Sequence, residues 1–453
     1  MINANLGSRR LSIGVVAIGR PTFDVPYAES LLATAMAALE GLDADIVGST
    51  ALQFDAEAMR SNLGALTEKP LDLLLVLQVT FTDATMTVEL AKSVDAPLVL
   101  WSFPEPRSGG RLRLNGFCGI NLAAHALGKA GQSFDYVHRE ADSPEALKEI
   151  MALARAGYVK RRLTQTRIGV VGEHPAGFDT CSYDTAELKS RFGVETQTLP
   201  IGGFIASAAA VDDAKADAVR ARAAGDLGSL DDLDQDSLQK SMKVYVALRG
   251  LADEENLQAL AVRCWPEFFT DFGCAACGPM AFMNQDGTPC GCEADVFGAL
   301  SSLVLQWTAG EPAFNTDLVD VNVEDDTAVF WHCGQAPISM ADPEGPIGPA
   351  IHSNRKLPLL NEFALKPGRV TLARLTQAKN EIRLVLGGAE ILRAPLSFSG
   401  TSGVVRFDKP AGEVLERIMR EGLEHHTGLV YGEHRPALRR LAAMLDLPVI
   451  ELT

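Results

Sequence analysis

The stretch LSIGVVAIG at residues 11–19 decides the fold class, because it reads as a short buried strand that ends in glycine. Residues 27–42 follow with apolar side chains at helical spacing, and further strand-like runs occupy residues 71–77 and 96–101. Strands that alternate with helices in this way form a parallel sheet. The start of the chain therefore predicts a Rossmann-like α/β domain.

A second series of strands and helices begins after Thr164. A helical span at residues 143–163 ends the first series, and RIGVVG at residues 167–172 then repeats the opening pattern. Further elements are expected at residues 212–242 (helical), 259–264 (strand) and 294–307 (helix). Residues 1–164 and 165–310 therefore predict two N-terminal Rossmann-like domains with parallel sheets.

The pattern of the chain changes after residue 310. Alternating or β-branched runs joined by proline- and glycine-rich turns indicate strands at residues 318–323, 327–332, 368–375 and 381–386. Only at the end do a helix (433–445) and a short strand (448–452) return. Residues 311–453 thus predict a β-rich C-terminal domain with a closing helix, in a chain of the α/β class.

Composition indicates a globular protein and excludes several partners. The 453 residues are 47% hydrophobic and 22% charged, with a formal net charge of −17. That charge argues against binding to nucleic acid or to an anionic membrane. The polar segment at residues 1–10 lacks the apolar stretch of a secretory signal, and no apolar run approaches the length of a membrane span. We therefore expect a cytoplasmic protein with reduced thiols.

Four cysteines lie at short spacing and raise the question of a zinc site: Cys274, Cys277, Cys290 and Cys292. Four thiolates are the ligands of a structural zinc ion. The second pair is one residue short of the usual spacing, and small and apolar residues surround the first pair. We interpret them as small buried residues that pack close to a site.

Glu293, in PCGCEADVFGAL, lies between the end of a strand and the start of a helix. A carboxylate there faces the carboxyl edge of the sheet and suits a hard-cation ligand or a proton shuttle. The alternative is a helix-start carboxylate that the helix dipole favours. Asp317, in AFNTDLVDVN, follows the next helix, and a return strand there can bring it back beside Glu293. Asp320 is the other candidate for the same ligand position, and the alternative for both is an ordinary turn aspartate.

Two histidine sites complete the set of candidates. His425 and His426 are adjacent, so on a strand only one of them is expected to join a given site, and a surface pair is the alternative. His332, in VFWHCG, is expected to be a buried, hydrogen-bonded histidine or a substrate contact. Two carboxylates with one imidazole favour Mn²⁺, with Co²⁺ or Mg²⁺ as alternatives, over a thiolate zinc site.

Three blocks resemble the L-fucose/L-arabinose isomerase superfamily, at the level of a fucose isomerase-like protein: CEADVFGALSSLVLQWTAGEPAFNTD, VFWHCG and EHHTGLVYGEHRPALRRLAAMLDLPVIEL. The resemblance implies a metal-dependent aldose–ketose isomerase, an intramolecular oxidoreductase that works through a cis-enediol intermediate. It implies that Glu293 and Asp317 bind Mn²⁺ and move protons and that His426 is the third ligand.

The resemblance also implies contacts outside the metal set. Arg20 and Trp101 correspond to substrate-binding residues that reach the site of a neighbouring subunit, and His332 is placed in the site without a settled role on the metal. A homo-oligomer, hexameric or trimer-based, follows from this arrangement. A small-molecule sugar is the expected substrate.

Two other functions stay open at this point. One alternative is that the same scaffold serves an anionic sugar, sulfonated like sulfoquinovose or phosphorylated, with a cation from Arg107, Arg111 or Arg113, although these arginines also suit a solvated loop. A non-catalytic sugar-binding protein built from two α/β units is the other alternative. Ligation by His426 predicts that activity falls at low pH, because an imidazole must be neutral to bind metal and titrates near about pH 6.5.

Overall fold

The computed structural model describes residues 10–453 and divides into two compact units. The N-terminal unit comprises residues 10–162 with 436–445, and the large unit comprises residues 163–435 with 446–453. The polar segment at residues 1–9, on which the cytoplasmic prediction partly rests, lies outside the described residues. The division into three domains at residues 164 and 310 remains our proposal.

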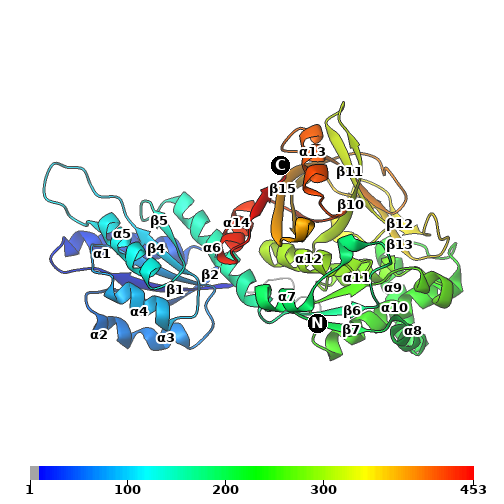
Figure 1. The fold of residues 1–453 in the computed structure, drawn as a ribbon, viewed down its shortest axis with the longest axis horizontal. Helices are drawn as coiled ribbons and strands as arrows, with labels where there is room; N and C mark the ends of the chain where they lie inside the picture. The colour runs from blue at the N-terminus through cyan, green and yellow to red at the C-terminus, as the bar shows by residue number, and fades with distance from the viewer. Residues whose placement is uncertain (1–9) are drawn as a thin grey trace. The chain divides into compact units, whose positions relative to one another are not determined.

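The N-terminal unit is built on a parallel sheet with strand order β2-β1-β3-β4-β5 (Figure 1). Its strands are β1 (Leu11–Ile18), β2 (Ala44–Gln53), β3 (Leu73–Gln78), β4 (Leu98–Ser102) and β5 (Phe134–His138). Its helices are α1 (Val25–Glu40), α2 (Ala56–Ser61), α3 (Leu63–Thr67), α4 (Thr85–Ser93), α5 (Gly116–Lys129), α6 (Pro144–Leu163) and α14 (Arg435–Met444). β1 and β3 are buried along their whole length, which confirms the sequence-based reading of the central strands.

The sequence did not predict β2, and its position explains why. β2 is an edge strand whose sequence, ADIVGSTALQ, mixes polar and apolar residues, and most of its side chains stay partly exposed. An edge strand does not need the continuous apolar run that marks a central parallel strand.

The large unit begins with a second parallel sheet of strand order β7-β6-β8-β9. Its strands are β6 (Arg167–Val171), β7 (Glu195–Leu199), β8 (Ala259–Val262) and β9 (Cys290–Cys292). Its helices are α7 (Thr185–Phe192), α8 (Ile201–Ala209), α9 (Asp213–Leu227), α10 (Gln235–Glu254), α11 (Cys277–Gln285) and α12 (Val296–Ala309). The helical region predicted at residues 212–242 is two helices, because Gly228 takes a left-handed φ of 86° and ends α9.

The rest of the large unit is a mixed sheet of order β12-β13-β16-β11-β10-β17-β14-β15-β18. Its strands are β10 (Phe314–Asn322), β11 (Thr327–His332), β12 (Ile347–Ala350), β13 (Leu360–Ala364), β14 (Gly368–Thr376), β15 (Arg383–Leu392), β16 (Thr401–Phe407), β17 (His426–Tyr431) and β18 (Val449–Glu451). An extra pairing of β15 with β16 closes the middle of this sheet into a barrel. The predicted fold class is thereby confirmed.

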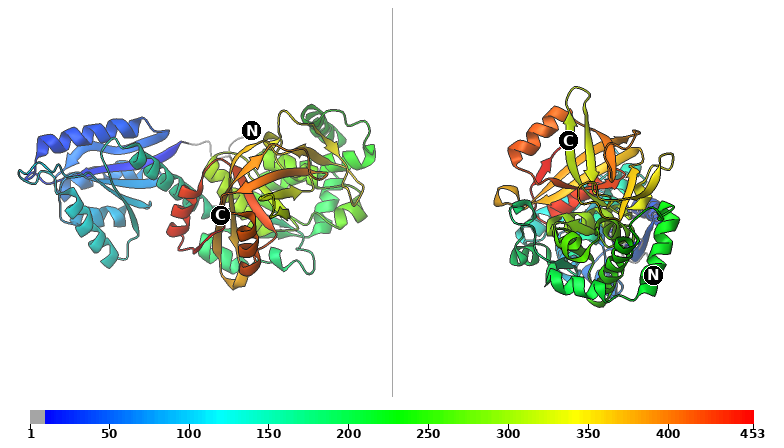
Figure 2. Two further views of the ribbon diagram at one scale, coloured as in Figure 1. Left: turned by 90° about the horizontal axis from the view of Figure 1, so that it is seen from above. Right: turned by 90° about the vertical axis from the view of Figure 1, so that its right-hand side faces the viewer.

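Figure 2 shows the α/β part of the large unit, in green, beside the β-rich part, in yellow to orange. α12 packs against β14 and β17 of the barrel and against β8 of the parallel sheet, so it joins the two parts. The closing helix predicted at residues 433–445 is present as α14, but the late helix α13 (Ala411–Glu421) was not predicted, so the expectation that a helix returns only at the end was wrong. No helix within residues 10–453 is long and apolar enough to cross a membrane.

Candidate active site

The turn between β9 and α12 carries Glu293. Glu293 and Ala294 both adopt the left-handed backbone conformation, with φ of 58° and 57°. This conformation costs a non-glycine residue about 1–3 kcal/mol and is concentrated at functional sites. The backbone N–H of Asp295 donates to the carbonyl of Cys292 at 2.9 Å and holds the turn. The fold therefore maintains a strained backbone in order to project the Glu293 side chain.

Two hydrogen bonds fix the Glu293 carboxylate. Trp265 Nε1 donates to its Oε1 at 3.0 Å, and His425 Nε2 lies 3.2 Å from its Oε2. Burial raises the pKa of Glu293, but the bonds from His425 and Trp265 outweigh burial and leave that pKa below its usual value. Glu293 is thus held as a carboxylate.

Strand pairing brings the other two predicted ligands to this point. β10 and β17 are antiparallel neighbours in which Asp317 lies opposite His426. His426 Nε2 is 3.5 Å from Asp317 Oδ1 and 4.0 Å from Glu293 Oε2. The structure therefore brings Glu293, Asp317 and His426 together, whereas the competitor Asp320 is exposed and lies in none of the metal-compatible sets described below.

His425 lies in the same place, contrary to the expectation that only one of the adjacent histidines joins the site. Both imidazoles reach Glu293, at 3.2 Å for His425 and 4.0 Å for His426. Strand alternation does not separate them, because β17 begins at His426 and His425 precedes it.

A buried ion pair stands behind His426 and was not recognised in the sequence. Asp295 is fully buried, and its Oδ2 lies 2.8 Å from His426 Nδ1. Arg374 donates to both oxygens of Asp295, at 2.8 and 3.2 Å, and its Nε lies 3.4 Å from Glu424 Oε2. Burial alone would raise the pKa of Asp295, but Arg374 and His426 hold it well below its usual range.

Asp295 fixes which nitrogen of His426 faces the site. A carboxylate on one ring nitrogen orients the imidazole and leaves the other nitrogen free for a metal ion. Here Nδ1 faces Asp295, so Nε2 faces Glu293 and Asp317. Asp295 also caps α12 by accepting from the Gly298 N–H at 2.8 Å, and this N-cap aspartate before an apolar run was the local signal available in the sequence.

Among residues 10–453, three sets of side chains bring ligand atoms within 4.8 Å of one another: Glu293 with His425 and His426, Asp317 with His332 and His426, and Cys181 with Asp295 and His426. The Cys181 set suits an ion least, because burial and the nearby carboxylates raise the pKa of its thiol. Asp317 Oδ1 is buried and has no hydrogen-bond partner among the described residues. A cation satisfies such an oxygen, so the residues present fit a divalent ion.

The ion pair of Glu293 with His425 predicts how pH affects metal binding. The hydrogen bond to Glu293 raises the pKa of His425. Below that pKa the protonated His425 is paired with the Glu293 carboxylate and competes with a metal ion for it, and this competition ends as the pH rises through the pKa. Mn²⁺ affinity is expected to increase with pH, and His425→Asn is expected to move the midpoint of this increase to lower pH. Calorimetric titration with Mn²⁺ at several pH values measures both midpoints, and equal midpoints would contradict competition by His425.

His332 lies beside the cluster. Its ring is 3% exposed and stacks on His426 with a centroid distance of 5.7 Å. Burial lowers the pKa of His332, but Cys333 and Asp317 outweigh it and raise that pKa to about 9. Its place near the site is clear, and its role on a metal or a substrate stays a prediction.

Arg20 and Trp101 belong to the N-terminal unit. Arg20 lies at the carboxyl edge of the sheet, where its Nη2 pairs with Asp83 Oδ2 at 2.8 Å. Trp101 is fully buried, packs edge-on against Phe103 and donates to the carbonyl of Arg139 at 3.3 Å. Neither belongs to the cluster around His426 within the large unit, and their contacts with a substrate stay predictions.

The short-spaced cysteines are all buried, as the interpretation of small packing residues expects. No metal-compatible set within residues 10–453 contains more than one cysteine, and the single one is Cys181. Cys292 instead lies beside the Cys264 thiol, next to the turn that carries Glu293.

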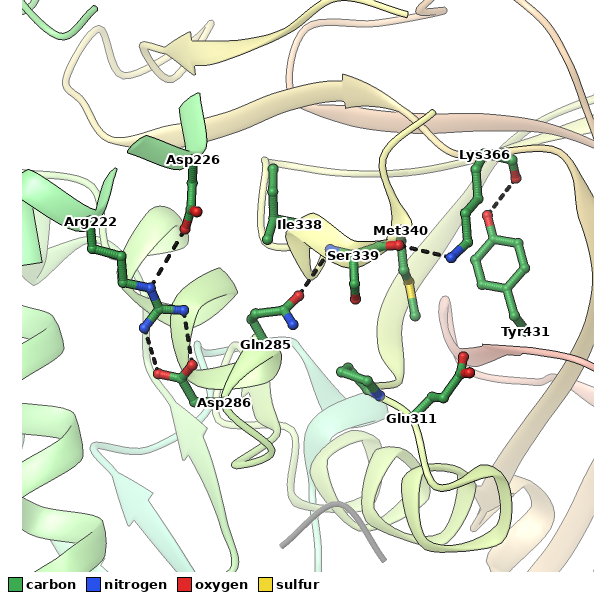
Figure 3. A pocket seen from close by; sticks show the side chains of 11 residues that line it. Arg222, Asp226, Gln285, Asp286, Glu311, Ile338, Ser339, Met340, Lys366 and Tyr431 are labelled. Atoms are coloured by element: carbon green, nitrogen blue, oxygen red, sulfur yellow. Dashed lines mark hydrogen bonds and ion pairs between the residues drawn. The ribbon is translucent and has the colours of Figure 1, made fainter. Parts of the chain in front are cut away.

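Two cavities help to locate the site. One of about 560 Å³ is lined by residues that include Thr180, Asp320 and His425, of which His425 also contacts Glu293. Another of about 450 Å³ lies elsewhere in the large unit, and Figure 3 shows that its cations are already bonded. Arg222 pairs with both oxygens of Asp286 at 2.7 and 2.9 Å. We therefore place the candidate active site at the His426 cluster.

Comparison with known proteins identifies the family of the chain. Residues 14–163 match the family described as "Fucose/sulfoquinovose isomerase, N-terminal domain". The chain is 33% identical over 384 residues to a sulfoquinovose isomerase of Alkalicoccus urumqiensis, which covers 84% of this chain and 86% of the relative. It is 31% identical over 433 residues to a sulfoquinovose isomerase of Priestia megaterium, covering 95% of this chain and 97% of the relative.

Proposed function

The chain belongs to the fucose/sulfoquinovose isomerase family of aldose–ketose isomerases, and we propose that it isomerises an anionic hexose, sulfoquinovose or a close analogue. The names of the relatives favour this substrate over the neutral sugar of a fucose isomerase, which was the first reading of the sequence. We propose Mn²⁺ as its metal. We also propose that the protein forms a homo-oligomer, hexameric or trimer-based, and light scattering tests this by measuring the mass of the assembly.

The observation that carries the proposed site is the convergence of Glu293, Asp317 and His426. These three side chains come from the β9–α12 turn, β10 and β17, and their carboxylate oxygens and imidazole nitrogen lie close together around one point. The unpartnered Asp317 Oδ1 lies there as well. Such a mixed oxygen and nitrogen set suits Mn²⁺, with Co²⁺ or Mg²⁺ as alternatives.

The chemistry follows from the side chains in this cluster. Glu293, Asp317 and His426 would hold a divalent ion, which would supply polarisation of the substrate carbonyl and stabilisation of negative charge on the substrate oxygens. Glu293 and Asp317 are the groups that take the proton from C2 and return it to C1, the transfer that converts an aldose to a ketose through a cis-enediol. Trp265 and His425 orient Glu293 for this role, and Asp295 orients His426.

A substrate panel with and without metal tests the proposal. We expect the purified protein to convert sulfoquinovose to its ketose, to lose this activity after chelation and to regain it with Mn²⁺. Glucose and fucose, which lack the anionic group, are expected to react more slowly. Conversion that survives complete removal of metal would contradict the metal site, and faster conversion of fucose would return the assignment to a neutral sugar.

A further inference from the structure

The loop between β12 and β13 carries an arginine beside the candidate active site. The Cζ atom of Arg355 lies 4.9 Å from the ring centroid of Trp265 and 5.2 Å from that of Phe269. Trp265 is the residue whose indole donates to Glu293 at 3.0 Å. The guanidinium is thus separated from the Glu293 carboxylate by one indole ring and one hydrogen bond.

The surrounding loop holds Arg355 in this position. His352 is 3% exposed, and its Nδ1 accepts from the backbone N–H groups of Asn354 and Arg355, each at 3.3 Å. The carbonyl of His352 accepts from the Lys356 N–H at 2.7 Å, and its N–H donates to the carbonyl of Leu357 at 2.9 Å. A turn built around a buried side chain pre-organises the cation that it presents.

Arg355 is exposed and, within residues 10–453, forms no ion pair with a carboxylate. Two other arginines of the large unit differ in this respect: Arg263 pairs with Glu267 at 2.8 Å, and Arg374 pairs with Asp295. The guanidinium does contact the imidazole of His352, with Nη1 3.2 Å from its Nε2, but Arg355 accepts an anion without giving up an ion pair. A guanidinium binds tetrahedral oxyanions through two parallel hydrogen bonds.

We propose that Arg355 binds the anionic group at C6 of the substrate, a sulfonate or a phosphate, while C1 and C2 lie at Glu293. This inference rests on the proposed isomerase function. An open-chain hexose runs from C1 to C6 through five carbon–carbon bonds of about 1.5 Å each, and Glu293 and Arg355 both contact the same indole. Arg355 is then the residue that selects a charged hexose over a neutral one.

The arginines of the N-terminal unit are less suited to this role within one chain. Arg113 pairs with Asp24 at 2.8 Å, and Arg111 lies 3.7 Å from the same carboxylate. Both guanidinium groups thus already interact with the Asp24 carboxylate. Arg107 lies on the same loop and is exposed.

Arg355→Ala, Arg355→Lys and Lys356→Asn test the assignment with sulfoquinovose, glucose 6-phosphate and glucose as substrates. Arg355→Ala is expected to lower the ratio of kcat/KM for each charged sugar to that for glucose by about 10- to 100-fold, because a charge-assisted hydrogen bond is lost. The loss is expected mainly in KM, and Arg355→Lys is expected to recover part of it. The control Lys356→Asn removes a neighbouring positive charge at a residue with φ of 63°, which asparagine tolerates, and is expected to keep the ratio.

The outcomes separate this inference from the proposed function. A wild-type protein without preference for the charged sugars would overturn the proposed substrate itself. A wild-type preference that persists unchanged in Arg355→Ala would overturn the role of Arg355 alone. An equal loss in Lys356→Asn would assign the effect to the charge of the loop and would also overturn it. A response to only one of the two charged sugars identifies which anion the site accepts.

Discussion

Glu293→Gln is expected to reduce turnover by on the order of 10³-fold or more, the loss typical of removing a group that transfers a proton. Glutamine keeps the volume of Glu293 and still accepts the hydrogen bond from Trp265. It lacks the negative charge that a divalent ion requires and the basicity that proton transfer requires. Steady-state turnover of sulfoquinovose at saturating Mn²⁺ measures the loss.

Glu267→Gln is the matched control for this substitution. Glu267 follows β8, the strand that pairs with β9, and its carboxylate pairs with Arg263 at 2.8 Å, but it does not belong to the cluster around His426. We expect the activity of Glu267→Gln to stay close to that of the wild type. Activity of Glu293→Gln within tenfold of wild type would remove Glu293 from the catalytic role. Sugar binding that persists after turnover is lost would show that the site still forms.

Asp295→Asn is expected to lower Mn²⁺ affinity by about 10- to 100-fold, the usual effect of removing the carboxylate that orients a ligating histidine. The substitution also leaves the buried Arg374 with only Glu424 at 3.4 Å as a carboxylate partner. Breaking a buried ion pair from one side costs about 3–5 kcal/mol of stability. Mn²⁺ titration and urea unfolding measure the two effects separately.

Asp286→Asn separates the orientation of His426 from a general loss of stability. Asp286 is buried and accepts a two-point ion pair from Arg222, as Asp295 does from Arg374, but it lies at the cavity of Figure 3. We expect this variant to lose stability and keep its Mn²⁺ affinity. If both variants weakened Mn²⁺ binding equally, Asp295 would have no specific effect on His426.

Local sequence patterns were sufficient to predict those helices and strands that depend mainly on their own residues. β11 was predicted with its observed bounds, Thr327–His332, because an apolar run between two turns carries its own signal. α13 was missed although it begins after Pro410, because within the helix only Ala411 and Val414 are fully buried and apolar side chains such as Met419 are exposed. Its place is decided by the barrel against which it packs.

The residues of the candidate site also differ in whether the sequence alone could predict them. Glu293 was recognisable because strand end, turn and helix start are adjacent in the chain. The meeting of Asp317 with His426 depends on the pairing of β10 with β17, which no local pattern specifies, and only the resemblance to known isomerases indicated it. Arg374 was not recognisable, because a buried arginine in a strand has no distinctive neighbours.

The position of β17 between β10 and β14 has a consequence for biosynthesis. Its two partners precede it in the chain, so the barrel has a vacant place for a strand until residues 426–431 have left the ribosome. His426 is the first residue of that strand and lies 131 positions beyond Asp295. Contacts so distant along the chain close late in folding. For a metal ion held by Glu293, Asp317 and His426, as proposed above, the complete ligand set therefore forms only after residues 426–431 have joined the barrel.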